Sequence, residues 1–118
     1  MTRWSSGWRG SPTSGGGRRA QAGQTVGPIQ NRAQFDKVRA ILDQARRDGR
    51  VVAGGTAEDR PGYFIRPTIV ADIDDDAELV AQEQFGPVLP VLRFSDPEDA
   101  LARANGTPWG LGGSVWGG

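Results

Sequence analysis

The chain has 118 residues, of which 36% are hydrophobic, so it is expected to form one modest domain with a small core. This size excludes a complete oxidoreductase that binds two substrates. The formal net charge is zero, but residues 27 onward carry ten basic side chains against fourteen acidic ones. That balance gives the folded part no electrostatic reason to bind nucleic acid or anionic lipid, and favours small molecules or protein as partners.

The chain contains neither cysteine nor histidine. Disulfides, thiolate metal sites and thiol nucleophiles are therefore excluded, and the commonest general base and metal ligand are both missing. No apolar run approaches the roughly 18 residues that span a bilayer, and residues 1–20 lack the apolar stretch of a secretory signal. We expect a cytoplasmic protein with no metal site and no membrane partner.

Residues 1–24 are rich in Gly, Ser and Arg and show neither a helical nor a strand period, so we expect this segment to be disordered. An alternative is a nucleic-acid-binding arm in which Arg pairs with phosphate and Trp4 or Trp8 stacks on bases. Four arginines without a supporting fold attract nucleic acid only weakly, which favours the flexible tail. The texture changes abruptly near Thr25, and this change indicates a shifted reading frame upstream of residues 25–118.

In chain order, the first predicted element is an amphipathic helix over residues 31–48 that stops at Gly49. Its apolar face consists of Phe35, Val38, Ile41, Leu42 and Ala45. Residues 51–53 are predicted to form a short strand, and a long turn follows from Gly54-Gly55. Residues 63–65 and 68–70 are the next extended segments, with Pro67 indicating an edge or a break between them.

The second half alternates in the same way. Residues 78–82 form a helical turn, and the apolar run of residues 88–94 reads as a buried strand. The segment Ser-Asp-Pro-Glu at residues 95–98 supplies a cap for a second helix that buries Ala100, Leu101 and Ala104. Residues 110–116 are predicted to form a last, glycine-rich strand. Strands that alternate with helices predict an α/β fold with a mostly parallel sheet flanked by helices.

Five segments carry a family resemblance. In order they read GPIQNRAQFDKV, AGG, GYFIRPTIV, EQFGPVLPV and ARANGTPWGLGGSVW, and they cover residues 27–116 without an obvious gap. Each segment alone is weak evidence, but five in this order at compatible spacing closely resemble the NAD(P)-dependent aldehyde dehydrogenase superfamily. The resemblance implies that residues 25–118 are an interior part of the catalytic domain of such an enzyme.

The resemblance also implies a cofactor site at the motif Glu-x-Phe-Gly-Pro, which begins at Glu83. In the family this motif lies beside the nicotinamide end of NAD or NADP. Glu83 is then expected to accept hydrogen bonds from the ribose hydroxyls, and Phe85 to lie against the ring. The alternative is that Glu83 is a solvated acid at a helix end and Phe85 a core residue; taken without the motif, the two residue types favour that alternative.

Three other groups of residues are weaker candidates. The acids Asp72, Asp74, Asp75, Asp76 and Glu78 resemble calcium ligands, but they lack the spacing of an EF-hand, so a solvated acidic turn is favoured. Gly54-Gly55 matches no phosphate-loop pattern and is predicted to be only a turn. Gln30, Asn31 and Asn105 are explained by helix capping.

Aldehyde dehydrogenases use a cysteine thiolate, a base glutamate and an oxyanion asparagine, and the resemblance locates none of these in the chain. We therefore expect no catalytic residue here, and a parent enzyme that oxidises an aldehyde to a carboxylic acid with NAD or NADP as a possible homo-oligomer. The second interpretation is an interaction module that docks on intact dehydrogenase subunits. The third is the nucleic-acid binder with a basic tail. The sequence leaves the aldehyde and the choice of cofactor open.

Overall fold

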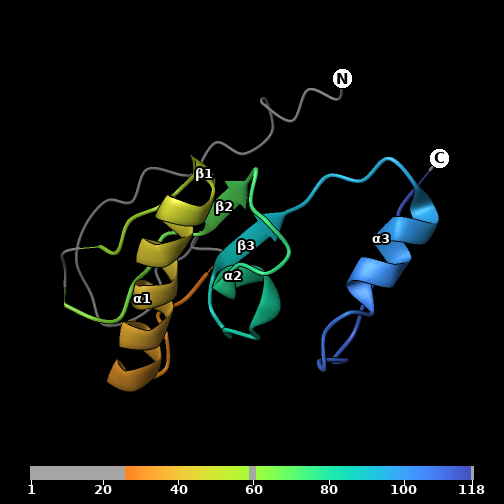
Figure 1. Cartoon of the computed structure of the whole chain (residues 1–118). Helices are drawn as coiled ribbons and strands as arrows, with labels where there is room; N and C mark the ends of the chain where they lie inside the picture. Colours follow the sequence, from red (N-terminus) through yellow and green to blue (C-terminus); the bar gives the residue numbers. More distant parts are fainter. Residues whose placement is uncertain (1–25, 59–60, 118) are drawn as a thin grey trace.

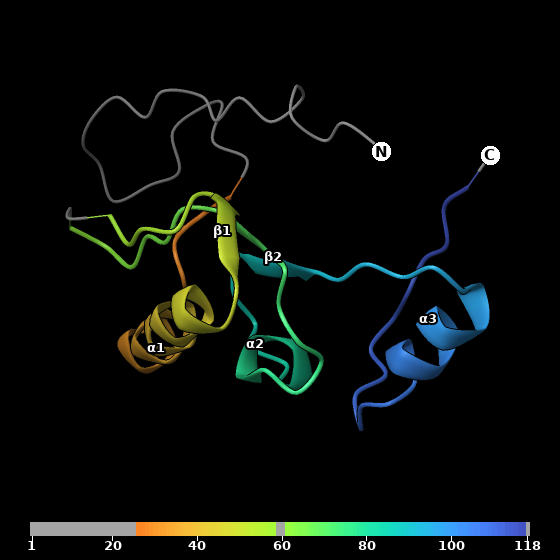
Figure 2. The same ribbon diagram turned by 45° about the horizontal axis from the view of Figure 1, so that its top comes forward.

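The computed structural model describes residues 26–58 and 61–117, and the predictions for residues 1–24 lie outside this part of the chain (Figure 1). The element order is α1 (Arg32–Asp48), β1 (Arg50–Ala53), β2 (Thr68–Ala71), α2 (Glu78–Ala81), β3 (Val88–Val91) and α3 (Pro97–Ala104). Helices α1 and α2 lie against the same side of a three-stranded sheet, whereas α3 lies apart from it (Figure 2). We call α1, the sheet and α2 the body, and residues 92–117 the α3 arm.

Helix α1 confirms the predicted apolar face. Val38, Ile41, Leu42 and Ala45 are buried, and Asn31 caps the first turn by accepting a hydrogen bond from the Gln34 N–H at 2.9 Å. The helix ends at Gly49, whose backbone is extended. Glycine is needed there for space, because a Cβ atom would lie 2.9 Å from the Ile73 Cβ and 3.0 Å from the Ala71 carbonyl oxygen.

The sheet order is β1-β2-β3, with β1 antiparallel to β2 and β2 parallel to β3. The described sheet is thus mixed, and the expectation of a mostly parallel sheet holds only for β2 and β3. The reason lies in the connections: the excursion from residue 54 to 67 turns the chain back alongside β1, whereas α2 forms a crossover that returns β3 parallel to β2. The α/β class predicted from the sequence is confirmed by the elements found.

The core lies between α1 and one face of the sheet. Val70 of β2 and Val88 of β3 are buried against the helix, with Leu79 of α2 closing one side. Thr68 is also buried, and its hydroxyl is satisfied by accepting from the Gly55 N–H at 2.9 Å and donating to the Arg66 carbonyl at 2.7 Å. Paired in this way, a buried hydroxyl is tolerated in an apolar core.

The excursion between β1 and β2 is a turn built on glycine. Gly54 and Gly55 have φ of +72° and +90°, and a Cβ on Gly54 would lie 2.1 Å from the Pro67 carbonyl oxygen. The extended segment predicted at residues 63–65 is reduced to a single bridge between Ala57 and Ile65. The positive φ values of Gly54 and Gly55 confirm the turn that was predicted at these two residues.

The apolar pattern of the second half misled the prediction in three places. Strand β3 buries Val88, but Leu89 and Val91 are exposed on the open face of the sheet. Helix α3 buries none of its residues, and Leu101 is 59% exposed. Residues 110–116 form no strand. The common reason is that no described segment packs over these surfaces, so their apolar side chains have no partner to be buried against.

No helix among the described residues is long and apolar enough to cross a membrane.

Candidate cofactor-binding loop

The candidate site is the loop of residues 82–87, which we call the site loop, between α2 and β3. Leu79 anchors α2 in the core, and the Gln82 N–H donates to the Glu78 carbonyl at 3.0 Å as the helix ends. At the other end, the Thr68 N–H donates to the Pro87 carbonyl at 2.8 Å, which ties the exit of the loop to β2. Both ends of the site loop are thus fixed to the body.

A glutamine from α1 holds the middle of the site loop. The Gln34 amide donates to the Gln84 carbonyl at 2.5 Å and lies 3.4 Å from the Phe85 carbonyl. The Gln84 side-chain amide donates to the Val88 carbonyl at 2.7 Å, and Gly86 brings the backbone so close to α1 that a Cβ would lie 2.7 Å from both methyl groups of Val38. The loop backbone is therefore fixed by the α1 surface.

Phe85 is the strained residue of the site loop. Its φ is +50°, a conformation that is a genuine outlier for a bulky side chain, and 70% of the residue is exposed. The alternative that Phe85 is a core residue is wrong, because the ring lies outside the core. Strain of this kind, held in place by surrounding contacts, is commonly found at functional sites.

Glu83 lies two residues before Phe85 and is half-buried. Its carboxylate forms no hydrogen bond or ion pair with residues 26–58 or 61–117. A carboxylate without a partner retains all its acceptor capacity, which suits the two hydroxyls of a ribose, and an exposed aromatic face suits a flat heterocycle. The residues present therefore fit the nicotinamide half of a dinucleotide.

Two of the acidic residues after β2, Asp72 and Asp75, form ion pairs with arginines. Asp72 accepts from Arg50 at 2.7 Å and lies 3.5 Å from Arg93, while Asp75 pairs with Arg103 at 2.8 Å. The hydrogen bond from Arg50, assisted by the charge of the same residue, lowers the pKa of Asp72 below its ordinary value. Within the described ranges, no group of three or more acids is placed to hold a metal ion.

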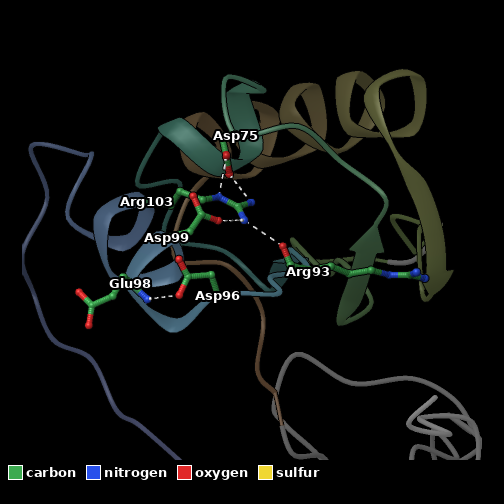
Figure 3. Close-up of polar contacts among 6 residues, drawn as sticks. All are labelled: Asp75, Arg93, Asp96, Glu98, Asp99 and Arg103. Atoms are coloured by element: carbon green, nitrogen blue, oxygen red, sulfur yellow. Dashed lines mark hydrogen bonds and ion pairs between the residues drawn. The ribbon is translucent and has the colours of Figure 1, made fainter.

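Four residues near the site were not singled out from the sequence. Gln34 and Gln84 hold the site loop, and Trp109 of the α3 arm contacts the end of α2. Arg103 of the same arm contacts Asp75, which precedes α2 (Figure 3). Gln34 and Gln84 are 50 residues apart, and Trp109 contacts a carbonyl 28 residues earlier. Neither composition nor periodicity reports on such distant pairs.

The model of the aldehyde dehydrogenase family matches residues 13–118. The chain belongs to the aldehyde dehydrogenase family. Among curated relatives, the 1-pyrroline-5-carboxylate dehydrogenase of Bacillus cytotoxicus is 44% identical over 99 residues, which is 84% of this chain and 19% of the relative. The segments that carry the resemblance begin at Gly27, whereas the family match begins earlier, at residue 13.

Solved structures agree in fold. The 1-pyrroline-5-carboxylate dehydrogenase from Thermus with bound NAD has a TM-score of 0.69 at 39% identity, covering 72% of this chain and 16% of that one. The aldehyde dehydrogenase of Mycobacterium tuberculosis complexed with NAD+ has a TM-score of 0.71 at 36% identity, covering 77% and 20%. The chain spans about a fifth of the length of these relatives. The predicted family and fold class are thereby confirmed.

Proposed function

We propose that the site loop binds the nicotinamide and adjoining ribose of NAD or NADP in an enzyme that oxidises an aldehyde to a carboxylic acid. The observation that carries the proposal is the proximity in sequence of two residues: Glu83, whose carboxylate has no partner among the described residues, and Phe85, an exposed aromatic with a strained backbone. Family membership supports the reaction class, and two similar structures hold bound NAD while a third is an NADP-dependent enzyme of E. coli.

The chemistry follows from the side chains. The Glu83 carboxylate accepts hydrogen bonds from the two ribose hydroxyls and so fixes the sugar. Phe85 would present a ring that restricts the orientation of the nicotinamide. When bound, the cofactor supplies a ring that accepts a hydride. The contacts that hold Phe85 in its strained conformation order the loop before binding, which reduces the entropy lost on association.

We further propose that the partners are an aldehyde and the nicotinamide cofactor, that the parent enzyme is a cytoplasmic homo-oligomer, and that neither nucleic acid nor membrane takes part. The acidic balance of residues 27 onward supports the last point.

The chain alone is expected to reduce no cofactor with any aldehyde, because it contains no cysteine and hence no thiolate nucleophile. The measurement is NADH formation by the purified chain with short and long aliphatic aldehydes. NADH formation that depends on the aldehyde, in a preparation free of host dehydrogenase, would contradict this.

The binding proposal is tested by titrating nicotinamide mononucleotide into the 118-residue chain and following the ligand by NMR. Glu83→Gln should weaken binding about tenfold, because a charge-assisted acceptor becomes neutral. Glu98→Gln is the matched control, since Glu98 lies on the exposed first turn of α3. The proposal fails if the wild-type chain does not bind, or if the two variants lose equal affinity.

Phe85→Gly should have opposite effects on ligand binding and on the stability of the fold. Removing the ring should abolish binding, while relief of the positive φ should raise the free energy of unfolding by up to about 1 kcal/mol. Phe94→Gly is the control, because Phe94 is also exposed and lacks a positive φ. A Phe85→Gly chain that binds normally would show that the ring has no part in recognition.

A second candidate function is docking on intact dehydrogenase subunits. The observation that favours it is the open face of the sheet, where Val52, Leu89 and Val91 are exposed. Leu89→Lys should then abolish co-purification of the chain with a full-length dehydrogenase of this family, whereas Phe94→Lys in the arm should not. Equal recovery of both variants would exclude this interface.

A further inference from the structure

The α3 arm contains no buried residue, so apolar packing does not explain why it lies where it does. Its attachment to the body includes hydrogen bonds from two side chains, from Arg103 to Asp75 and from Trp109 to Ala81. Both reach segments that flank the site loop. The residues that accept these hydrogen bonds therefore indicate what the arm does.

Arg103 connects the arm to the segment before α2. Its guanidinium donates to both carboxylate oxygens of Asp75 at 2.8 Å, and Nη1 donates to the Arg93 carbonyl at 2.8 Å (Figure 3). Asp75 precedes α2, and Arg93 lies at the start of the arm just after β3, so one side chain ties the start of the arm to the segment before α2. Bidentate pairing of this kind fixes direction as well as distance.

Trp109 reaches the point where α2 becomes the site loop. Its indole N–H donates to the Ala81 carbonyl at 2.9 Å, and Ala81 is the last residue of α2. The last carbonyls of a helix have no partner within the helix, so this hydrogen bond satisfies a group that is otherwise left to water. Ala81 lies two residues before Glu83, so this hydrogen bond restrains the peptide plane at the entry of the site loop.

We propose that Trp109, on an arm that Arg103 ties to Asp75, is a positioning residue that holds the entry of the site loop in its ligand-binding geometry. The expected effect on ligand affinity rests on the proposed function, whereas the expected effect on the order of residues 82–87 does not. A strained residue such as Phe85 persists only where its surroundings over-determine the backbone. Gln34 contacts the loop from α1 and Trp109 contacts its entry from the arm, so loss of the Trp109 contact removes one of the constraints on the backbone before Phe85.

The test compares two Trp→Phe variants within the arm. Trp109→Phe keeps an aromatic ring and removes the N–H that reaches Ala81, whereas Trp116→Phe removes an N–H whose acceptor, among the described residues, is Ser114 of the same arm. Hydrogen exchange of the peptide that covers residues 82–87, measured by mass spectrometry without ligand, should accelerate about five- to tenfold in Trp109→Phe and remain unchanged in Trp116→Phe. Equal exchange in both variants would overturn the inference.

Binding of nicotinamide mononucleotide is the second readout. Trp109→Phe should weaken it about fivefold with an unchanged midpoint of urea unfolding, because the body does not depend on the arm. If the wild-type chain does not bind the mononucleotide but exchange at residues 82–87 still responds to Trp109→Phe, the proposed function fails and the positioning role remains. If Glu83→Gln lowers affinity and Trp109→Phe changes neither affinity nor exchange, the positioning role fails alone.

Discussion

Leu42 and Leu101 are both helical leucines, yet Leu42 is 1% exposed in α1 whereas Leu101 is 59% exposed in α3. The contrast extends to the regions around them. The body buries a continuous apolar cluster between α1 and the sheet, while the α3 arm has no buried residue and is held by charged and polar side chains. Apolar burial determines the stability of the first region, and directional contacts determine the placement of the second.

Leucine truncation gives the largest expected difference between the two regions. Leu42→Ala should lower the free energy of unfolding by about 2–5 kcal/mol, because it opens a cavity in the core. Leu101→Ala should change it by no more than about 0.5 kcal/mol, since the side chain is already in water. Urea unfolding followed by circular dichroism measures both. Comparable losses would mean that α3 is packed in solution and that the contrast is false.

Two glycine substitutions, one in the site loop and one in the arm, test the same contrast between the body and the arm. Gly86→Ala should cost about 1–3 kcal/mol, because the added methyl meets Val38 at 2.7 Å and forces the loop away from α1. Gly110→Ala in the arm meets nothing within 4 Å and should be neutral to within about 0.5 kcal/mol. Thermal unfolding of both variants is the measurement. A neutral Gly86→Ala would indicate that the site loop is not seated on α1.

The same contrast separates what the sequence could predict from what it could not. The face of α1 was predictable, because a helical repeat of apolar residues identifies the side that seeks burial. The predictions for Leu101 and for the strand at residues 110–116 were wrong, because an apolar pattern does not say what will cover it. Within the described residues, nothing does.

The candidate cofactor site could be predicted from the sequence only through the motif Glu-x-Phe-Gly-Pro. Glu83 and Phe85 were singled out because of the segment around them, and their cofactor role stays a prediction. The positive φ of Phe85 could not be predicted from the sequence, since that strain depends on contacts from α1. Trp109 was equally hidden, because its hydrogen bond to Ala81 depends on how the chain folds back after α3.

Asp72 gives the smallest expected effect and tests where the two regions meet. Its carboxylate faces Arg50 of the body at 2.7 Å and Arg93 of the arm at 3.5 Å, and the hydrogen bond from Arg50 is the largest cause of its lowered pKa. Arg50→Gln should therefore raise the pKa of Asp72 toward its ordinary value more than Arg93→Gln does. The pKa is measured by NMR titration of the carboxyl carbon.

The sign of the stability effect follows from the direction of that shift. A carboxyl whose pKa is lower in the folded chain stabilises the fold above its ordinary pKa of about 3.9, and the contribution is lost as the pH falls through the folded value. In Arg50→Gln this acid-sensitive contribution should shrink, and it should be nearly intact in Arg93→Gln. If Arg93→Gln instead produced the larger rise in the pKa of Asp72, the arm would govern this carboxylate and the two regions would be coupled through charge. The expected order assigns Asp72 to the body, which leaves Arg103 and Trp109 as the contacts through which the arm acts on the site loop.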